Sequence, residues 1–190
     1  MLAQDEIKRL SLRLQTTELN IRREFVQHQF LRFFYQQPNA QKVFFKGGTA
    51  LRIAYQSPRF SEDLDFDSRL SFNELEGVIQ STLEMLDKDG IKNEILESKK
   101  TSGGYLGVIK LDNLNTSLEI SNRKSSKGEP ITIVGDFTLP YTIFLLAREN
   151  LFSEKIDAFL SRQKPRDYYD LYFILRSNLF FAISKDLAPM

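Results

Sequence analysis

Apolar residues recur along the first third of the chain with two different periods. Between residues 4 and 36 they repeat about every 3.6 positions among charged residues, which predicts an amphipathic helix that Pro38-Asn39 ends. Residues 43–45 form a short apolar run typical of a strand. A helix is expected over 49–56, and the strict alternation of Asp with apolar residues over 63–67 predicts a second strand.

The rest of the chain predicts further strands followed by helices. We expect a helix over 73–88; strands over 91–97, 105–111 and 117–121; additional edge strands over 131–134 and 143–147; and helices over 148–160, 165–175 and 179–187. This order favours one α+β domain spanning residues 1–190. Residues 1–140 supply N-terminal helices and a sheet, and residues 141–190 supply a C-terminal helical part that completes a cleft.

Composition narrows the class of protein. The 190 residues are 42% hydrophobic with 16 Phe and 7 Tyr, which excludes a wholly disordered chain, and folding can bury about 70% of the surface. The absence of cysteine excludes disulfides, thiol catalysis and Cys-based metal sites, and a single histidine, His28, excludes multi-His metal sites. With a net charge of +1, no signal peptide and no long apolar run, the chain is expected to be cytoplasmic, without a membrane contact.

A diglycine follows the first predicted strand. Gly47 and Gly48 allow a ligand to approach the backbone closely, and the helix that begins at Thr49 directs free N–H groups at that ligand, an arrangement that suits phosphate. Thr49 can donate its hydroxyl to a phosphate oxygen, and Lys46 and Arg52 can neutralise phosphate charge. The alternative is a tight turn with Thr49 as a helix cap, beside a solvated lysine and a surface salt bridge.

Two aspartates alternate on the second predicted strand. Asp63 and Asp65 share one face at a spacing of about 6.8 Å, because successive side chains of a strand point to opposite sides. Carboxylates that repel each other are commonly held together by a divalent cation, and a donor set of oxygens alone indicates Mg²⁺ or Mn²⁺. The alternative is the solvent-facing side of an edge strand. Glu119, between two apolar residues of a later strand, is a candidate third ligand or another solvated position.

Two blocks of sequence carry a family resemblance. KGGTAL (46–51) with RFSEDLDF (59–66), and SEKIDA (153–158) with RQKPRDYYDL (162–171), resemble the AbiEii/AbiGii toxin family of the DNA polymerase beta-like nucleotidyltransferase superfamily. The resemblance implies a small mixed β-sheet flanked by helices, with an N-terminal helical segment and a C-terminal helical subdomain. It also implies that Lys155, Asp167 and Asp170 line a catalytic cleft. From the residues alone, Asp167 and Asp170 are equally well explained as helix-capping and ion-pairing groups.

These observations predict an enzyme. The paired aspartates would hold metal against a nucleoside triphosphate (NTP), and a nucleotidyl group would be transferred to a hydroxyl acceptor. The resemblance further implies the toxin of a type IV toxin–antitoxin or phage-defence system, with a cognate antitoxin protein and a tRNA acceptor. The basic loop containing Arg123, Lys124 and Lys127 can bind an RNA backbone or be merely solvated. A non-catalytic nucleotide-binding module and the same chemistry on a protein hydroxyl are the alternatives.

Overall fold

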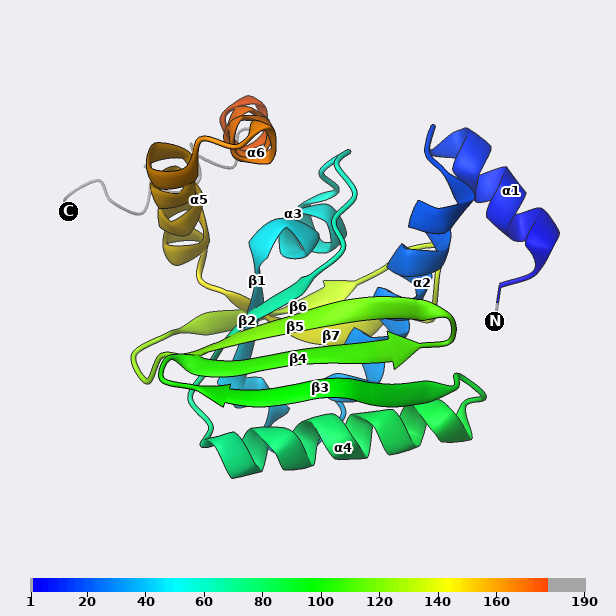
Figure 1. The fold of residues 1–190 in the computed structure, drawn as a ribbon. Helices are drawn as coiled ribbons and strands as arrows, with labels where there is room; N and C mark the ends of the chain where they lie inside the picture. The colour runs from blue at the N-terminus through cyan, green and yellow to red at the C-terminus, as the bar shows by residue number, and fades with distance from the viewer. Residues whose placement is uncertain (1, 178–190) are drawn as a thin grey trace.

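A mixed seven-stranded sheet organises the chain (Figure 1), whose computed structural model describes residues 2–177. The strands lie in the order β3-β4-β5-β2-β1-β7-β6. The strands are β1 (Val43–Lys46), β2 (Leu64–Ser68), β3 (Asn93–Thr101), β4 (Gly104–Leu111), β5 (Leu114–Asn122), β6 (Gly128–Ile133) and β7 (Tyr141–Leu146). The helices are α1 (Gln4–Arg13), α2 (Glu18–Phe34), α3 (Gly47–Tyr55), α4 (Phe72–Lys88), α5 (Arg148–Arg162) and α6 (Pro165–Arg176), with a short 3₁₀ turn at Ala40–Lys42.

Both parallel and antiparallel pairs occur in this sheet. Strand β2 runs antiparallel to β1 and parallel to β5, and β1 runs parallel to β7. The mixed sheet and the helices around it confirm the predicted α+β class. Figure 1 shows α4 below the sheet and α3, α5 and α6 above it.

The alternation in β2 separates the core from the polar face of the sheet. Leu64 and Phe66 are fully buried on one side, where Phe66 stacks on Phe34 of α2 with ring centroids 5.5 Å apart. Asp65 and Asp67 therefore point to the opposite side, where Asp65 lies against Gly47 of α3 and Asp67 pairs with Lys46. Burial of the apolar side fixes the register of β2, because a slip of one residue would bury the aspartates and expose Leu64 and Phe66.

Two predicted elements differ from the structure. The helix expected over 4–36 is divided into α1 and α2, because Gln15 takes a positive φ of 50° and the Thr17 side chain accepts a hydrogen bond from the Asn20 N–H and starts a new helix. The strand expected at the sheet edge over 143–147 is instead internal, since β7 lies between β1 and β6.

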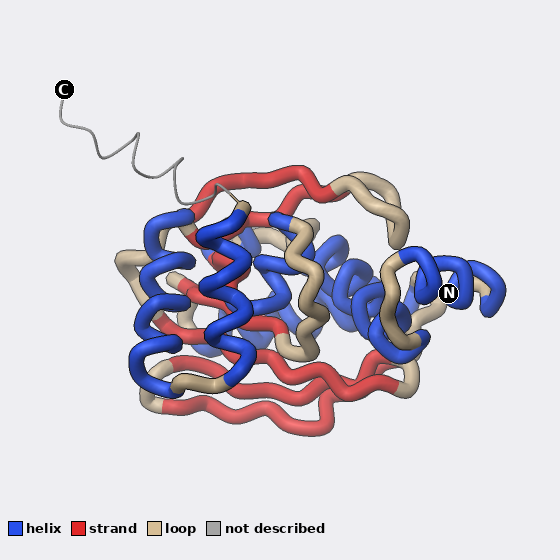
Figure 2. Tube along the Cα trace, turned by 90° about the horizontal axis from the view of Figure 1, so that it is seen from above, coloured by secondary structure: helices blue, strands red, loops and turns tan. Residues whose placement is uncertain are grey.

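The C-terminal helices begin after β7. They agree with the expected ranges 148–160 and 165–175 to within two residues, whereas the helix expected over 179–187 lies outside the described residues. Seen from above, the C-terminal helices and α1 lie at opposite ends of the molecule (Figure 2). Within residues 2–177, no helix combines the length and apolarity needed to cross a membrane.

Candidate active site

The diglycine after β1 forms the first two residues of α3, which begins at Gly47 and not at Thr49 as expected, and it lies against two charged side chains. Gly47 has a positive φ of 82°, and a Cβ at this position would lie 1.9 Å from Oδ2 of Asp65. A Cβ on Gly48 would lie 2.3 Å from Nη2 of Arg59. Position 47 therefore favours glycine through both its backbone conformation and its contact with Asp65, whereas a side chain at position 48 would require the Arg59 guanidinium to move.

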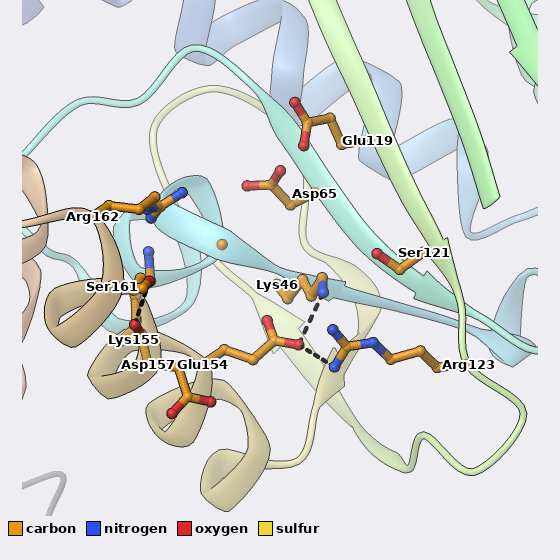
Figure 3. A pocket seen from close by; sticks show the side chains of 12 residues that line it. Lys46, Asp65, Glu119, Ser121, Arg123, Glu154, Lys155, Asp157, Ser161 and Arg162 are labelled. Atoms are coloured by element: carbon orange, nitrogen blue, oxygen red, sulfur yellow. Dashed lines mark hydrogen bonds and ion pairs between the residues drawn. The ribbon is translucent and has the colours of Figure 1, made fainter. Parts of the chain in front are cut away.

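Three strands place charged residues side by side next to this turn. In the sheet register Asp65 of β2 lies opposite Lys46 of β1 on one side and opposite Glu119 of β5 on the other. Figure 3 shows Asp65 and Glu119 on neighbouring strands, with Lys155 and Arg162 of α5 facing them. The sheet therefore brings together Asp65 and Glu119, which are far apart in the sequence.

Crowding of negative charge changes the acidity of Asp65. Burial raises its pKa, and the carboxylates of Glu119 and Asp63 raise it further, to about 6, although Lys155 and Lys46 partly oppose the shift. The ionised form of Asp65 is thus disfavoured in the protein alone. A bound cation would relieve this penalty.

Two cavities meet at these carboxylates. The larger cavity has a volume of about 390 Å³ and lies between the sheet and α5; the smaller cavity has a volume of about 130 Å³ and lies between the diglycine turn and α6. The two cavities share four lining side chains: Asp65, Glu119, Lys155 and Arg162. Asp63 and Gly48 line the smaller cavity, whereas Lys46 and Gly47 line the larger one.

Lys155 is held in place by a buried ion cluster. Its Nζ donates a hydrogen bond of 2.8 Å to Oδ2 of Asp170, and Arg59 donates from Nε and Nη2 to the two oxygens of the same carboxylate, at 2.7 and 2.9 Å. Burial by itself would raise the pKa of Asp170, but the hydrogen bonds and charges of Arg59 and Lys155 outweigh it and lower the pKa. Asp170 therefore remains ionised and fixes the position of both cations.

Asp167 lines the smaller cavity and also caps the N-terminus of α6. One carboxylate oxygen accepts a hydrogen bond of 2.8 Å from Arg162, and the other accepts one of 3.1 Å from the backbone N–H of Lys164. Asp167 is therefore a helix-capping and ion-pairing group that orients Arg162 toward the carboxylates.

Two residues expected to contact phosphate have other partners. The Thr49 side chain is fully buried and donates its hydroxyl to the backbone carbonyl of Asp63, so it fixes the start of β2 instead of facing either cavity. Arg52 donates from Nε to both oxygens of Glu24, at 3.1 Å each, and lines neither cavity. Arg52 therefore points toward α2, and the structure does not bring it to the cavities beside the diglycine.

The sequence pattern identified only some of the residues that line the two cavities. Arg162 and Glu154 line the larger cavity, yet they lie on an amphipathic helix where many charged residues are solvated. Asp67 is buried; it accepts one hydrogen bond from Ser126 and forms an ion pair with Lys46. Its position on the same face as Asp65 was visible in the alternation of β2, whereas its partners required the fold.

The donor set fits a divalent cation supplied together with a substrate. Among residues 2–177, no group of three or more Asp, Glu, His or Cys side chains is arranged to hold a metal by itself. Asp63, Asp65 and Glu119 nevertheless all line the smaller cavity, and their mutual repulsion adds to burial in raising the pKa of Asp65. These residues fit Mg²⁺ or Mn²⁺ whose remaining ligands are phosphate oxygens.

Comparisons with known proteins identify the fold and the family of this chain. No curated protein matches the chain significantly. The structure of MenT4, a nucleotidyltransferase toxin from Mycobacterium tuberculosis H37Rv, superposes with a TM-score of 0.67 at 19% identity over 90% of this chain, which spans 63% of the MenT4 chain. JHP933 from Helicobacter pylori superposes with a TM-score of 0.59 at 26% identity, over 84% of this chain and 67% of JHP933. The family model described as "Nucleotidyl transferase AbiEii toxin, Type IV TA system" matches residues 29–188, and the chain therefore belongs to this family.

Proposed function

We propose that the protein is a metal-dependent nucleotidyltransferase that moves a nucleotidyl group from an NTP to a hydroxyl on tRNA. The observation that carries this proposal is the register of Asp65 with Glu119 beside the Gly47-Gly48 turn, facing Lys155 across two adjoining cavities. Such a site holds oxygen ligands, cations and an anion-binding turn within one cleft. This combination is what transfer between a polyphosphate and a hydroxyl requires.

Each group has a defined part in the reaction. Asp63, Asp65 and Glu119 would hold Mg²⁺ or Mn²⁺, which neutralises phosphate charge and lowers the pKa of an attacking hydroxyl. Gly48 and the N-terminus of α3 seat the phosphates. Lys155 offsets the charge that develops on the phosphate chain, and Asp170 orients Lys155.

The transfer balances without a further reactant. The acceptor oxygen forms a bond to the α-phosphorus, the bond between the α-phosphorus and the oxygen bridging to the β-phosphate breaks, and pyrophosphate leaves. The hydroxyl proton passes to a carboxylate of the cleft. Asp170 is poorly suited to accept it, because the two cations that lower its pKa keep it ionised.

The family supplies the biological setting of this proposal. A type IV toxin acts against its own host, so we include a cognate antitoxin protein among the partners of this chain. NTPs and tRNA are both cytoplasmic, which places the proposed reaction in the cytoplasm.

The test is transfer of label. Purified protein is incubated with each α-³²P-labelled NTP, Mg²⁺ or Mn²⁺, and total tRNA; label is expected in tRNA. Asp63→Ala should reduce the rate on the order of 10²-fold or more, with little change in thermal unfolding. Asp5→Ala, which removes an exposed aspartate of α1, is the matched control.

The same assay separates the competing functions. Label in protein instead of tRNA would assign a protein acceptor, and nucleotide binding without any transfer would assign a binding module. Either result contradicts the proposal. An Asp63→Ala variant with the wild-type rate would refute the metal assignment.

A further inference from the structure

The wall of the larger cavity formed by β1, α5 and the loop after β5 carries a closed ion cluster. One oxygen of Glu154 on α5 accepts hydrogen bonds from Nζ of Lys46 at 3.0 Å and from Nη1 of Arg123 at 2.8 Å (Figure 3). Lys46 also lies 2.7 Å from Oδ1 of Asp67, whose other oxygen accepts a hydrogen bond of 2.6 Å from Ser126. Glu154 thus links α5 to Lys46 on β1 and to Arg123 on the loop after β5, and Lys46 is in turn paired with Asp67 on β2.

Within this cluster the charges cancel. Lys46 and Arg123 supply two positive charges, and Asp67 and Glu154 supply two negative ones. An additional anion can bind the two cations without an unpaired charge only if it replaces one carboxylate. Asp67 is held by Ser126 and only 2% of its side chain is exposed, whereas the Glu154 side chain is 26% exposed. Glu154 is therefore the group that an incoming anion can displace.

The two cavities suit different parts of the reactants. The smaller cavity, at about 130 Å³, is lined by four cationic side chains and five carboxylates, so a phosphate chain would bind there together with the proposed metal ion. The larger cavity, at about 390 Å³, is within the range of sites that hold a nucleotide-sized ligand, and it includes Ala158 and Ser121 beside its charged groups.

The larger cavity also leads to a basic surface. Arg123 is about half exposed and begins the loop between β5 and β6, on which Lys124 and Lys127 are exposed. A strand of RNA leaving the larger cavity past Arg123 would therefore meet further positive charge. This surface gives a polynucleotide, but not a free nucleotide, additional contacts.

We propose that the larger cavity binds the 3′-terminal nucleotide of an RNA acceptor, that Lys46 and Arg123 bind its 5′ phosphodiester, and that Glu154 occupies this phosphate position until RNA enters. This rests on the proposed nucleotidyl transfer. The terminal hydroxyl then faces the carboxylates that both cavities share, and the NTP phosphates lie in the smaller cavity. Arg123 and Lys46 act as acceptor-binding residues, and Glu154 acts as their competitor.

Binding can be measured without any catalysis. The probe is a short fluorescein-labelled single-stranded RNA with a free 3′ hydroxyl, followed by fluorescence anisotropy over a series of salt concentrations. Arg123→Ala should weaken binding roughly tenfold, the effect of one charge-assisted hydrogen bond, and make the slope of log K against log salt shallower by about 0.7. Glu154→Gln keeps the shape of the side chain but removes the competing charge, so it should tighten binding.

Kinetics then locate the effect within the reaction. Arg123→Ala should raise KM for the acceptor RNA and leave KM for the NTP unchanged, and Glu154→Gln should lower KM for the acceptor. Arg9→Ala, which removes an exposed arginine paired with Glu6 on α1, controls for loss of positive charge far from the cavity. Thermal unfolding of each variant verifies the fold.

The outcomes are distinct. Weaker RNA binding in Glu154→Gln would mean that the cluster is only a structural link between α5 and the sheet. A raised KM for the NTP in Arg123→Ala would mean that Lys46 and Arg123 bind the NTP and not the RNA. Each result overturns the proposal. If label is transferred only to protein and RNA does not bind, the proposal also fails. If no transfer occurs but both variants change RNA binding as expected, the RNA site is supported while the proposed function fails.

Discussion

Replacement of Asp65 by asparagine should stabilise the protein while abolishing its activity. Asparagine has nearly the same shape as aspartate, so the close approach of this side chain to Gly47 is retained. The substitution removes a negative charge from a half-buried position beside Glu119 and Asp63. The same charge is a metal ligand in the proposed reaction, so function and stability should change in opposite directions.

The expected gain follows from the acidity of Asp65. Burial and the neighbouring carboxylates raise its pKa from 3.8 to about 6. Because one pKa unit corresponds to about 1.4 kcal/mol, ionisation of Asp65 costs the folded state about 3 kcal/mol at neutral pH. A carboxyl group whose pKa is raised by folding holds its proton more tightly in the folded state, so the free energy of unfolding falls as pH rises from about 4 to 6 and is then constant. The Asp65→Asn variant has no carboxyl group to ionise at this position, so this fall in the free energy of unfolding is absent.

Urea unfolding of both proteins, without metal, at about pH 4 and about pH 7.5 measures the effect. The variant should be more stable than the wild type by about 3 kcal/mol at the higher pH and nearly equal at the lower one. Mg²⁺ with an NTP should stabilise the wild type and not the variant. If the two proteins are equally stable at the higher pH, or if the difference between them does not depend on pH, then burial and the neighbouring carboxylates do not raise the pKa of Asp65 as stated.

Three further substitutions test other parts of the site. Asp170→Asn should lower the free energy of unfolding by about 3–5 kcal/mol, because the buried Lys155 and the partly buried Arg59 lose their shared counter-charge; urea unfolding near neutral pH measures it, and an unchanged free energy of unfolding would contradict the ion cluster. Gly47→Ala should reduce both stability and transfer, since its φ is positive and a methyl group would overlap Asp65; a fully active, stable variant would show that the turn can relax. Thr49→Val should cost about 1–3 kcal/mol by leaving the Asp63 carbonyl without its hydrogen bond, yet KM for the NTP should not change; a raised KM in a normally stable variant would restore the phosphate contact expected for Thr49.

Local pattern was enough to locate the strands that carry the chemistry. The alternation over 63–67 identified β2 and showed that Asp65 lies on the face opposite Leu64, because strand periodicity is a property of the chain alone. Glycines 47 and 48 similarly marked the change from strand to helix, although α3 already includes both of them. The division of the first long helix was missed, since Gln15 has no residue-type signal for a positive φ.

The partners of each charged side chain were decided only by tertiary structure. Whether Glu119 lies beside Asp65 depends on which strands pair and in what register, and no local pattern in β5 specifies that β2 is its neighbour. The same is true of Thr49 and Arg52, whose hydrogen bonds go to Asp63 and to Glu24 on another helix. Residue type and period are encoded within a few positions of the chain, whereas ion pairs and cavities arise where distant segments are packed together by burial of their apolar faces. Residue types and spacing therefore revealed the class of chemistry, and packing alone determined which residues share the cleft.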